Sequence, residues 1–349
     1  QGTLAQVGAA GASILGAILV GPEAGRAIGQ VAAVGAQGYV ASYSRDQEYE
    51  ADELGVRYTG RVGFDPDGMA GFLAKLEAEK TLIARLRSRE PQGSSYFDTH
   101  PPTPDRVSRA QRLASKVRVK DEIDGRDVFL SKIDGMIWGD SPDQGYARDG
   151  VFAHEGLNIR YEVPDDFTLF NSATKVIAYG PDDAAIVFDT GPQNYGGSMR
   201  DYIRQTWAAN ARLSNLETID VNGLDAATAT TRGTSNGRTV DARLVAIKGK
   251  QGHTFRLVFL SPSNQAAKLD AAFRKTAFSF RHMTAAERKD LGPLRIRLYK
   301  VRSGDTIDSI ARSQMSVTKF ARERLMLLNG LSDGAQLQVG RTLKVIRDS

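Results

Sequence analysis

The sequence predicts a multi-domain protein with a mainly α-helical first region, an α+β middle region and a small βααβ unit at the C-terminal end. A chain of 349 residues is too long for one ordinary hydrophobic core. Residues 1–120 read as helical, whereas residues 121–290 contain short β-like runs broken by glycine, proline, aspartate and asparagine. Residues 291–349 form a separate, compact pattern. These three ranges are the expected domains.

The composition is that of a soluble globular protein, with 41% hydrophobic and 25% charged residues. The formal charge of +5 is spread without a dense lysine and arginine run, which argues against a nucleic-acid partner. The sequence has no cysteine, so disulfides, thiolate zinc sites and a cysteine nucleophile are excluded. This absence is compatible with an oxidising periplasm.

The chain opens with a glycine- and alanine-rich stretch, Ala9–Val40, interrupted at Gly21-Pro22. We expect a hairpin of two small-residue helices there, loosely held. The apolar run Ala9–Val20 is too short for a membrane-spanning helix, which needs about 20 residues. Peripheral membrane association of this hairpin is a remaining hypothesis.

Three further helices are expected in the first region. A charged helix covers Arg45–Thr59. Asp65 and Pro66 have the residue types of an N-cap and a first helical position, and they predict the start of the next helix. Pro104 and Asp105 predict another start.

In the middle region we expect an antiparallel sheet with a few helices on it. The pattern resembles PsbP-like domains. Neither His154 nor His253 belongs to a catalytic pattern, and an interaction or spacer role is expected. The expected strands are Val151–Ala153, Leu157–Val163, Lys175–Tyr179, Ala185–Phe188, Ala242–Ile247, Thr254–Leu260 and Ala277–Phe280, and the expected helices are Met199–Asn210 and Asn264–Lys275.

The most informative residues lie on the charged helix. Glu48 and Asp52 are four residues apart and therefore share one helical face. Such a pair alone is most often a solvated acidic face. A glutamate can also be a zinc ligand, and an aspartate one turn later can accept the ring N–H of a histidine ligand.

The wider context favours the metal interpretation. Three segments follow one another: SRDQEYEADELGVRY at 44–58, GFDP at 63–66 and THPPTPDRV at 99–107. Together they resemble the HtpX-like zinc metallopeptidases, the family that includes the CaaX prenyl proteases, in its bacterial periplasmic branch. The resemblance covers residues 1–115. It implies a Zn²⁺-dependent endopeptidase of the cell envelope with a protein or peptide substrate.

The resemblance also implies roles for single residues. Glu48 would be the third zinc ligand and Asp52 the partner of a histidine ligand. His100 would be catalytic, at the open position of the metal or beside an oxyanion. Arg106 would polarise a substrate carbonyl or, as we favour, ion-pair with the acidic helix. Gly55 would allow close helix packing.

The sequence departs from this family in one serious respect. None of the histidines His100, His154, His253 and His282 lies in an HExxH motif. This motif supplies two zinc ligands and the general base. We expect a truncated chain that is inactive alone, with Zn²⁺ absent or poorly held. The alternative is a non-catalytic envelope adaptor that binds cell-wall glycan or outer-membrane proteins.

The terminal unit has its own signature. It contains YKVRSGDTIDSIA at 299–311, LNGL at 328–331 and LQVGRTLKV at 337–345. These segments resemble the LysM module, a strand–helix–helix–strand fold that binds N-acetylglucosamine polymers such as peptidoglycan. Asp305 and Thr306 would form the first turn and cap the first helix. The expected glycan-binding loops lack an aromatic platform, so a structural role is equally open.

Overall fold

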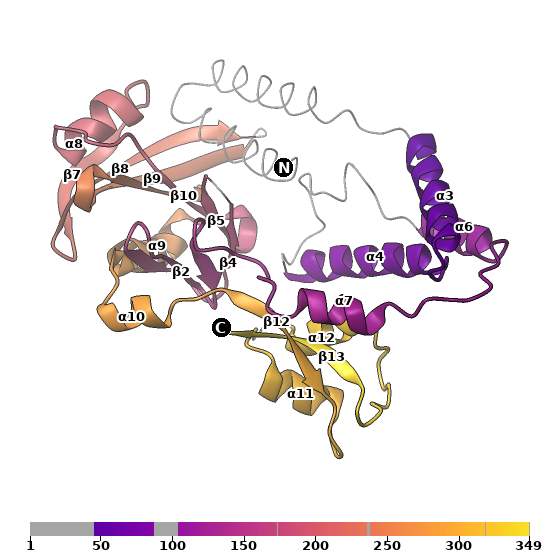
Figure 1. Cartoon of the computed structure of the whole chain (residues 1–349). Helices are drawn as coiled ribbons and strands as arrows, with labels where there is room; N and C mark the ends of the chain where they lie inside the picture. The colour runs from indigo at the N-terminus through magenta and orange to yellow at the C-terminus, as the bar shows by residue number, and fades with distance from the viewer. Residues whose placement is uncertain (1–44, 87–103, 173, 236–237, 318, 349) are drawn as a thin grey trace. The chain divides into compact units, whose positions relative to one another are not determined.

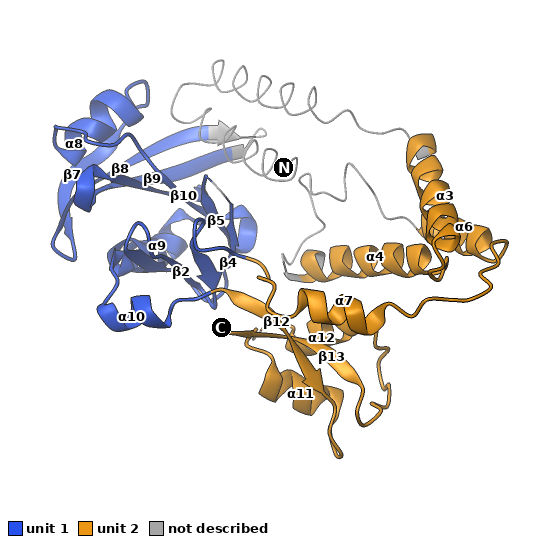
Figure 2. Ribbon diagram, in the orientation of Figure 1, with its two compact units in different colours: residues 1–39, 140–292 blue, residues 40–139, 293–349 orange. Residues whose placement is uncertain are grey.

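The computed structural model describes residues 45–86, 104–172, 174–235, 238–317 and 319–348 (Figure 1). The expected Ala9–Val40 hairpin and His100 lie outside these residues. The chain divides into two compact units (Figure 2). The described part of the first unit is 140–292, and the second combines residues before Asp140 with those from Pro293 onward. The chain therefore leaves the second unit after Gly139 and returns to it at Pro293. A multi-domain fold that mixes helices and sheets is confirmed.

The described residues of the second unit before Asp140 form four helices. They are α3 (Arg45–Arg61), α4 (Gly68–Leu86), α6 (Pro104–Ala114) and α7 (Arg126–Ile133). The expected helix Arg45–Thr59 is confirmed by α3. Helix α4 begins two residues after Pro66 because Asp65 first forms a turn, in which its carboxylate accepts the N–H of Asp67 at 2.9 Å. The core of α3, α4 and α6 is small and consists of Val56, Ala70, Leu73, Ala110 and Ala114.

The same unit contains the βααβ motif. Its elements are β12 (Leu294–Lys300), α11 (Ile307–Gln314), α12 (Ala321–Asn329) and β13 (Thr342–Asp348). The two strands pair antiparallel. Thr306 caps α11 in a capping box with Ser309, and Asp305 accepts the Tyr299 hydroxyl at 2.8 Å. The turn expected at Asp305-Thr306 is therefore confirmed.

An upstream segment extends this two-stranded sheet. The N–H groups of Gly135 and Trp138 donate to the carbonyls of Ile296 and Leu294, each at 2.8 Å. Ile296 returns a bond to the carbonyl of Met136 at 2.9 Å. The Trp138 side chain packs against the core that the two helices and two strands enclose. Residues 135–138 thus form an isolated β-bridge, Ile137 with Arg295, beside the sheet of the βααβ motif.

The first unit is built on a seven-stranded antiparallel sheet in the order β4-β5-β6-β10-β9-β8-β7. A smaller sheet has the order β1-β2-β3-β11. The strands are β1 (Tyr146–Arg148), β2 (Val151–His154), β3 (Ile159–Glu162), β4 (Thr168–Asn171), β5 (Val176–Tyr179), β6 (Ala185–Thr190), β7 (Ser214–Val221), β8 (Leu224–Ser235), β9 (Arg238–Lys248), β10 (Thr254–Pro262) and β11 (Arg281–His282). The helices are α8 (Met199–Asp201), the π-helix Tyr202–Trp207, α9 (Ala266–Ser279) and α10 (Ala285–Asp290), with short 3₁₀ turns at Pro181–Asp183 and Lys250–Gly252.

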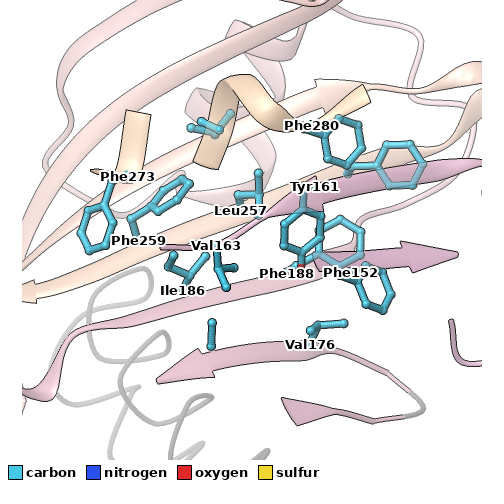
Figure 3. Packing of buried hydrophobic residues seen from close by; sticks show 14 of the residues in the cluster. Phe152, Tyr161, Val163, Val176, Ile186, Phe188, Leu257, Phe259, Phe273 and Phe280 are labelled. Carbon is cyan, nitrogen blue, oxygen red and sulfur yellow. The ribbon is translucent and has the colours of Figure 1, made fainter. Parts of the chain in front are cut away.

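Alternation along the strands gives the large sheet a hydrophobic core on each face. On β10, Phe255, Leu257 and Phe259 join the core formed with the small sheet and α9 (Figure 3). The intervening Val258 and Leu260 join the core formed with α8 and the π-helix. The expected strand Ala277–Phe280 is wrong, because Ala277 lies in the last turn of α9. The expected helix Asn264–Lys275 is largely α9.

A charged network ties α10 to the small sheet. Glu287 accepts Arg281 Nη2 at 2.6 Å and Arg160 Nη1 at 2.5 Å, and its carboxylate also accepts the N–H of Thr284 at 2.8 Å. The Arg281 guanidinium, then the Thr284 N–H and Arg160, hold the pKa of Glu287 well below its usual range. The folded state therefore keeps this carboxylate ionised where an unfolded chain would protonate it.

Glu287→Gln should remove a pH-dependent part of the stability. Because the pKa of Glu287 is lowered in the folded protein, its ionised carboxylate stabilises the fold at pH values above the unfolded-state pKa of about 4.3. This stabilisation decreases as the pH falls from that value toward the lower pKa of the folded state. The variant should melt at a lower temperature than the wild type at pH 7, with the gap closing toward pH 3. Thermal unfolding at stepped pH measures this, with the exposed Glu155→Gln as the matched control. A gap that stays constant between pH 7 and pH 3 would contradict the assignment.

Candidate functional site

The two acidic residues singled out on α3 are buried. Glu48 is 8% exposed and Asp52 is 3% exposed, although α3 as a whole is strongly polar. Their shared face turns toward α6, whose first turn contributes Arg106. Glu50, two residues from each of them, is exposed to solvent. The structure therefore selects Glu48 and Asp52 from the six acidic residues between Asp46 and Asp65 as the inward pair.

Arg106 binds both carboxylates. Its Nε and Nη2 donate to the two oxygens of Asp52, each at 2.8 Å. Its Nη1 lies 2.8 Å from Oε2 of Glu48. We call these three residues the carboxylate–arginine cluster. The ion pair that the sequence favours for Arg106 is present, with a bidentate geometry that suits the planar guanidinium.

Close helix packing brings the cluster together. A Cβ atom at Gly55 would overlap Cε of Met69 on α4, so this glycine lets α3 and α4 approach as expected. One turn beyond Asp52, Val56 is 1% exposed and packs in the same core as Ala110 of α6. Small side chains at these contacts allow α6 to reach α3. Arg106 therefore contacts the acidic face of α3.

A second layer of contacts lies beside the cluster. The Tyr49 hydroxyl donates to Asp105, the residue before Arg106. The Arg109 guanidinium lies 4.8 Å from the centre of the Tyr49 ring and 3.7 Å from the carboxylate of Glu53. These contacts are more exposed than the cluster, so each contributes little on its own. Together they add exposed side-chain contacts between α3 and α6.

The cluster holds two carboxylates and one guanidinium, so its formal charge is −1. Carboxylate oxygen is a zinc ligand type, but a catalytic zinc needs three protein ligands. Among the described residues, no group of three histidine, cysteine, aspartate or glutamate side chains could hold a metal ion. These residues thus fit one ligand of a zinc site and not a complete site.

The described histidines belong to the first unit, whereas the cluster belongs to the second. His282 Nδ1 is 2.8 Å from the carbonyl of Asn158. His154 Nδ1 accepts the N–H of Leu157 at 3.3 Å, and burial lowers its pKa. His253 packs parallel to the Phe255 ring. The site role of His100 stays a prediction, as do the ligand role of Glu48 and the catalytic role of Arg106.

A polar pocket in the first unit was missed by sequence reasoning. Asp189 of β6 and Arg256 of β10 are cross-strand partners and form a bidentate ion pair, with both bonds at 2.6 Å. They line this pocket together with Asn171. These residues are far apart in sequence and share no motif, so only the strand register could have revealed them.

In the described part of the chain, no helix is long and apolar enough to cross a membrane.

Comparison with protein families identifies both ends of the chain. Residues 3–114 match the profile of Peptidase family M48, and residues 299–345 match that of the LysM domain. The first match contains the carboxylate–arginine cluster. The second covers the βααβ motif from Tyr299 to Val345.

Curated relatives agree with the first match. The Beta-barrel assembly-enhancing protease of Escherichia coli (strain K12) is 33% identical over 129 residues, which are 37% of this chain and 25% of that protein. The same enzyme of Yersinia pestis is 31% identical over 123 residues, 34% of this chain and 24% of that protein. A Protease HtpX homolog of Kineococcus radiotolerans is 36% identical over 86 residues, 20% of this chain and 28% of that protein. The chain thus spans about a quarter of the length of these relatives.

Solved structures give a more distant likeness. The cyanobacterial PsbP of Synechocystis sp. PCC 6803 aligns with a TM-score of 0.30 at 15% identity, over 42% of this chain and 98% of that chain. At this level the alignment does not establish a shared fold. The family matches do establish a relationship at the two ends: residues 3–114 are a region of the M48 peptidase family, related to HtpX-like proteases, and residues 299–345 are a LysM domain.

Proposed function

We propose that this chain carries one part of the active site of a zinc-dependent endopeptidase of the bacterial cell envelope. The observation that carries this proposal is the buried carboxylate–arginine cluster inside the M48 region. An acidic helix face with no role in packing or binding would keep Glu48 and Asp52 in water, where ionised groups are most stable. Burial of both carboxylates on one face supports a role that needs them there.

Each residue of the cluster has a proposed role. Glu48 supplies one carboxylate ligand to zinc, and Asp52 accepts the ring N–H of a histidine that binds the metal. Arg106 is a positioning residue, because it fixes the rotamers of both carboxylates through three bonds of 2.8 Å. For His100 the proposed role is catalytic, at the substrate or at the open metal position. A zinc ion, when bound, would activate a water molecule for attack on a peptide carbonyl.

The cellular setting is proposed from the relatives and the LysM domain. One group of relatives is named for enhancing β-barrel assembly, and we propose that envelope proteins, including misfolded ones, are substrates of this chain as well. The LysM domain supports a periplasmic location and contact with peptidoglycan. Peripheral contact with a membrane is a weaker part of this proposal.

A non-catalytic adaptor is the second candidate. Two observations favour it: the sequence has no HExxH motif, and the described residues hold no three-ligand group. The LysM domain and the polar pocket of the first unit would then be the binding surfaces of the adaptor. Zinc binding by the protein expressed from the complete gene distinguishes the two candidate functions, because only the peptidase needs zinc.

The 349-residue chain alone should hydrolyse no protein. It lacks the two histidine ligands and the general base that the chemistry requires. The measurement is casein cleavage with added Zn²⁺, using a preparation whose intact mass matches 37.9 kDa. Cleavage that a chelator abolishes and zinc restores would overturn this expectation.

In the protein expressed from the complete gene, Glu48→Gln should remove most of the bound zinc. Glutamine keeps the size of the side chain and an acceptor for Arg106 but removes the anionic ligand. Asp52→Asn should be milder, with about 10–100-fold lower zinc affinity or activity, as for other partners of metal ligands. Zinc content and peptide turnover are measured side by side.

Glu50→Gln is the matched control, because Glu50 lies on the same helix but faces solvent. It should retain zinc and activity. Loss of zinc in the control with retention in Glu48→Gln would move the ligand assignment along α3. A wild-type protein that binds no zinc and cleaves nothing would support the adaptor instead.

A further inference from the structure

A second pocket of the first unit, of about 660 Å³, is rich in arginine. It lies on the face of the large sheet that α9 covers, where strands β7 to β10 and the first turns of α9 contribute side chains. No family match reaches these residues. We call it the arginine pocket. Its charged lining residues are Arg212, Arg232, Arg243, Asp241 and Asp270.

The strand register assembles this pocket from residues that are far apart in sequence. Ser214 of β7 lies opposite Thr230 of β8, and Thr230 lies opposite Arg243 of β9. Two residues further along β8, Arg232 lies opposite Asp241. Side chains two residues apart on a strand share one face of the sheet. Polar groups of three neighbouring strands therefore project to the same side.

The base of the pocket is closed, and its open surface is charged. Phe259 and Phe273, labelled in Figure 3, are 1% and 4% exposed, with ring centres 5.1 Å apart. They belong to the hydrophobic core and are out of reach of a ligand. The side chains of Arg232, Asp270 and Arg243 are 67%, 40% and 18% exposed. A ligand therefore meets guanidinium and carboxylate groups rather than an apolar floor.

The three lining arginines keep N–H donors that no other described group uses. Arg243 donates through Nη2 to Oδ1 of Asp270 at 2.5 Å, whereas its Nε and Nη1 have no partner among the described residues. Neither of these two nitrogens is fully buried. Arg232 uses Nε and Nη2 on Asp241, which leaves Nη1. Arg212 is exposed and has no hydrogen bond or ion pair within the described ranges.

Positive charge is in excess at the pocket. Asp270 accepts from two arginines, Arg243 at 2.5 Å and Arg274 at 2.9 Å. Asp241 accepts from Arg232, and this hydrogen bond lowers the pKa of the carboxyl, which is therefore ionised at pH 7. The third lining arginine has no carboxylate partner among the described residues. Four guanidinium groups and two carboxylates together carry a formal charge of +2.

We propose that the arginine pocket binds a phosphate group, either as free phosphate or as a monoester of a larger molecule. A phosphomonoester carries a charge of about −1.5 to −2 at pH 7 and three acceptor oxygens. This charge balances the excess of the pocket, and the oxygens match the unused N–H donors of arginine, which binds phosphate with fork geometry. A carboxylate carries a single negative charge and would balance only half of the excess. The first unit is then an anion-binding domain, whichever function the M48 region has.

The binding test titrates the full 349-residue chain at pH 7 and low ionic strength with inorganic phosphate and with glycerol 3-phosphate, by calorimetry. Acetate is the singly charged comparison. Both phosphates should bind saturably and about tenfold more tightly than acetate, because one further hydrogen bond between charged groups contributes about that factor. Absence of saturable binding of both phosphates at millimolar concentration would overturn the proposal. Equally tight binding of acetate would overturn it as well.

The variant Arg212→Gln locates the site. Because Arg212 is exposed and unpaired within the described residues, its replacement should leave the melting temperature unchanged. Phosphate binding should weaken about tenfold, the usual effect of one hydrogen bond to a charged group. Arg204→Gln is the matched control, since Arg204 is an exposed arginine of the π-helix, on the opposite face of the sheet. An equal loss of phosphate binding in the two variants, or no loss in Arg212→Gln, would contradict the assignment.

Vesicles distinguish the two sources of the phosphate group. Co-flotation of the chain is measured with phosphatidylcholine vesicles that contain or lack phosphatidate, whose headgroup is a phosphomonoester. Flotation only with phosphatidate, weakened in Arg212→Gln and retained in Arg204→Gln, would identify a membrane lipid as the ligand. Binding of glycerol 3-phosphate without flotation would identify a soluble phosphate. Flotation that both variants weaken equally would come from the basic surface as a whole and would contradict the site.

Discussion

Three bonds of Arg106 join α6 to α3 in the described part of the M48 region. Two carboxylates one turn apart on α3 cannot be buried against α6 unless a cation meets them, and Arg106 supplies it with fork geometry. Removal of one partner from a buried charge cluster typically costs about 3–5 kcal/mol, because the remaining charge is left uncompensated. The hydrophobic core around Val56 and Ala110 is small, with five buried residues. The same carboxylate–arginine cluster therefore forms the candidate site and stabilises the packing of α3 on α6.

The two remaining parts of the chain carry their own cores. The large sheet of the first unit is buried on both faces, and the network around Glu287 joins α10 to the small sheet. The LysM domain gains an isolated β-bridge and three backbone hydrogen bonds from Gly135–Trp138, a segment far upstream in sequence. These residues lie outside the family match, so backbone hydrogen bonds connect this domain to the preceding chain.

Local patterns in the sequence predicted the parts of the fold that depend on local physics. The spacing of Glu48 and Asp52 placed them on one helical face, and Asp305-Thr306 marked the start of α11. Strands β7 and β8 were missed, because threonine and alanine in β8 give little apolar alternation. The segment Ala277–Phe280 read as a strand, yet Phe273 and Ala277 are four residues apart on the buried face of α9. The ion pair of Asp189 with Arg256 depends on strand register, which no local pattern encodes.

Native-state hydrogen exchange across α3 and α6 tests the central claim most directly. Arg106→Met should lower protection in both helices by an amount equivalent to about 3–5 kcal/mol. Neutralising the carboxylates as well, in Glu48→Gln/Asp52→Asn/Arg106→Met, should restore much of it, because no buried charge is then left unpaired. Arg109→Met, a more exposed arginine on the same helix, is the matched control and should change little. Unchanged protection in Arg106→Met would contradict the account, since the cluster would then not hold the two helices together.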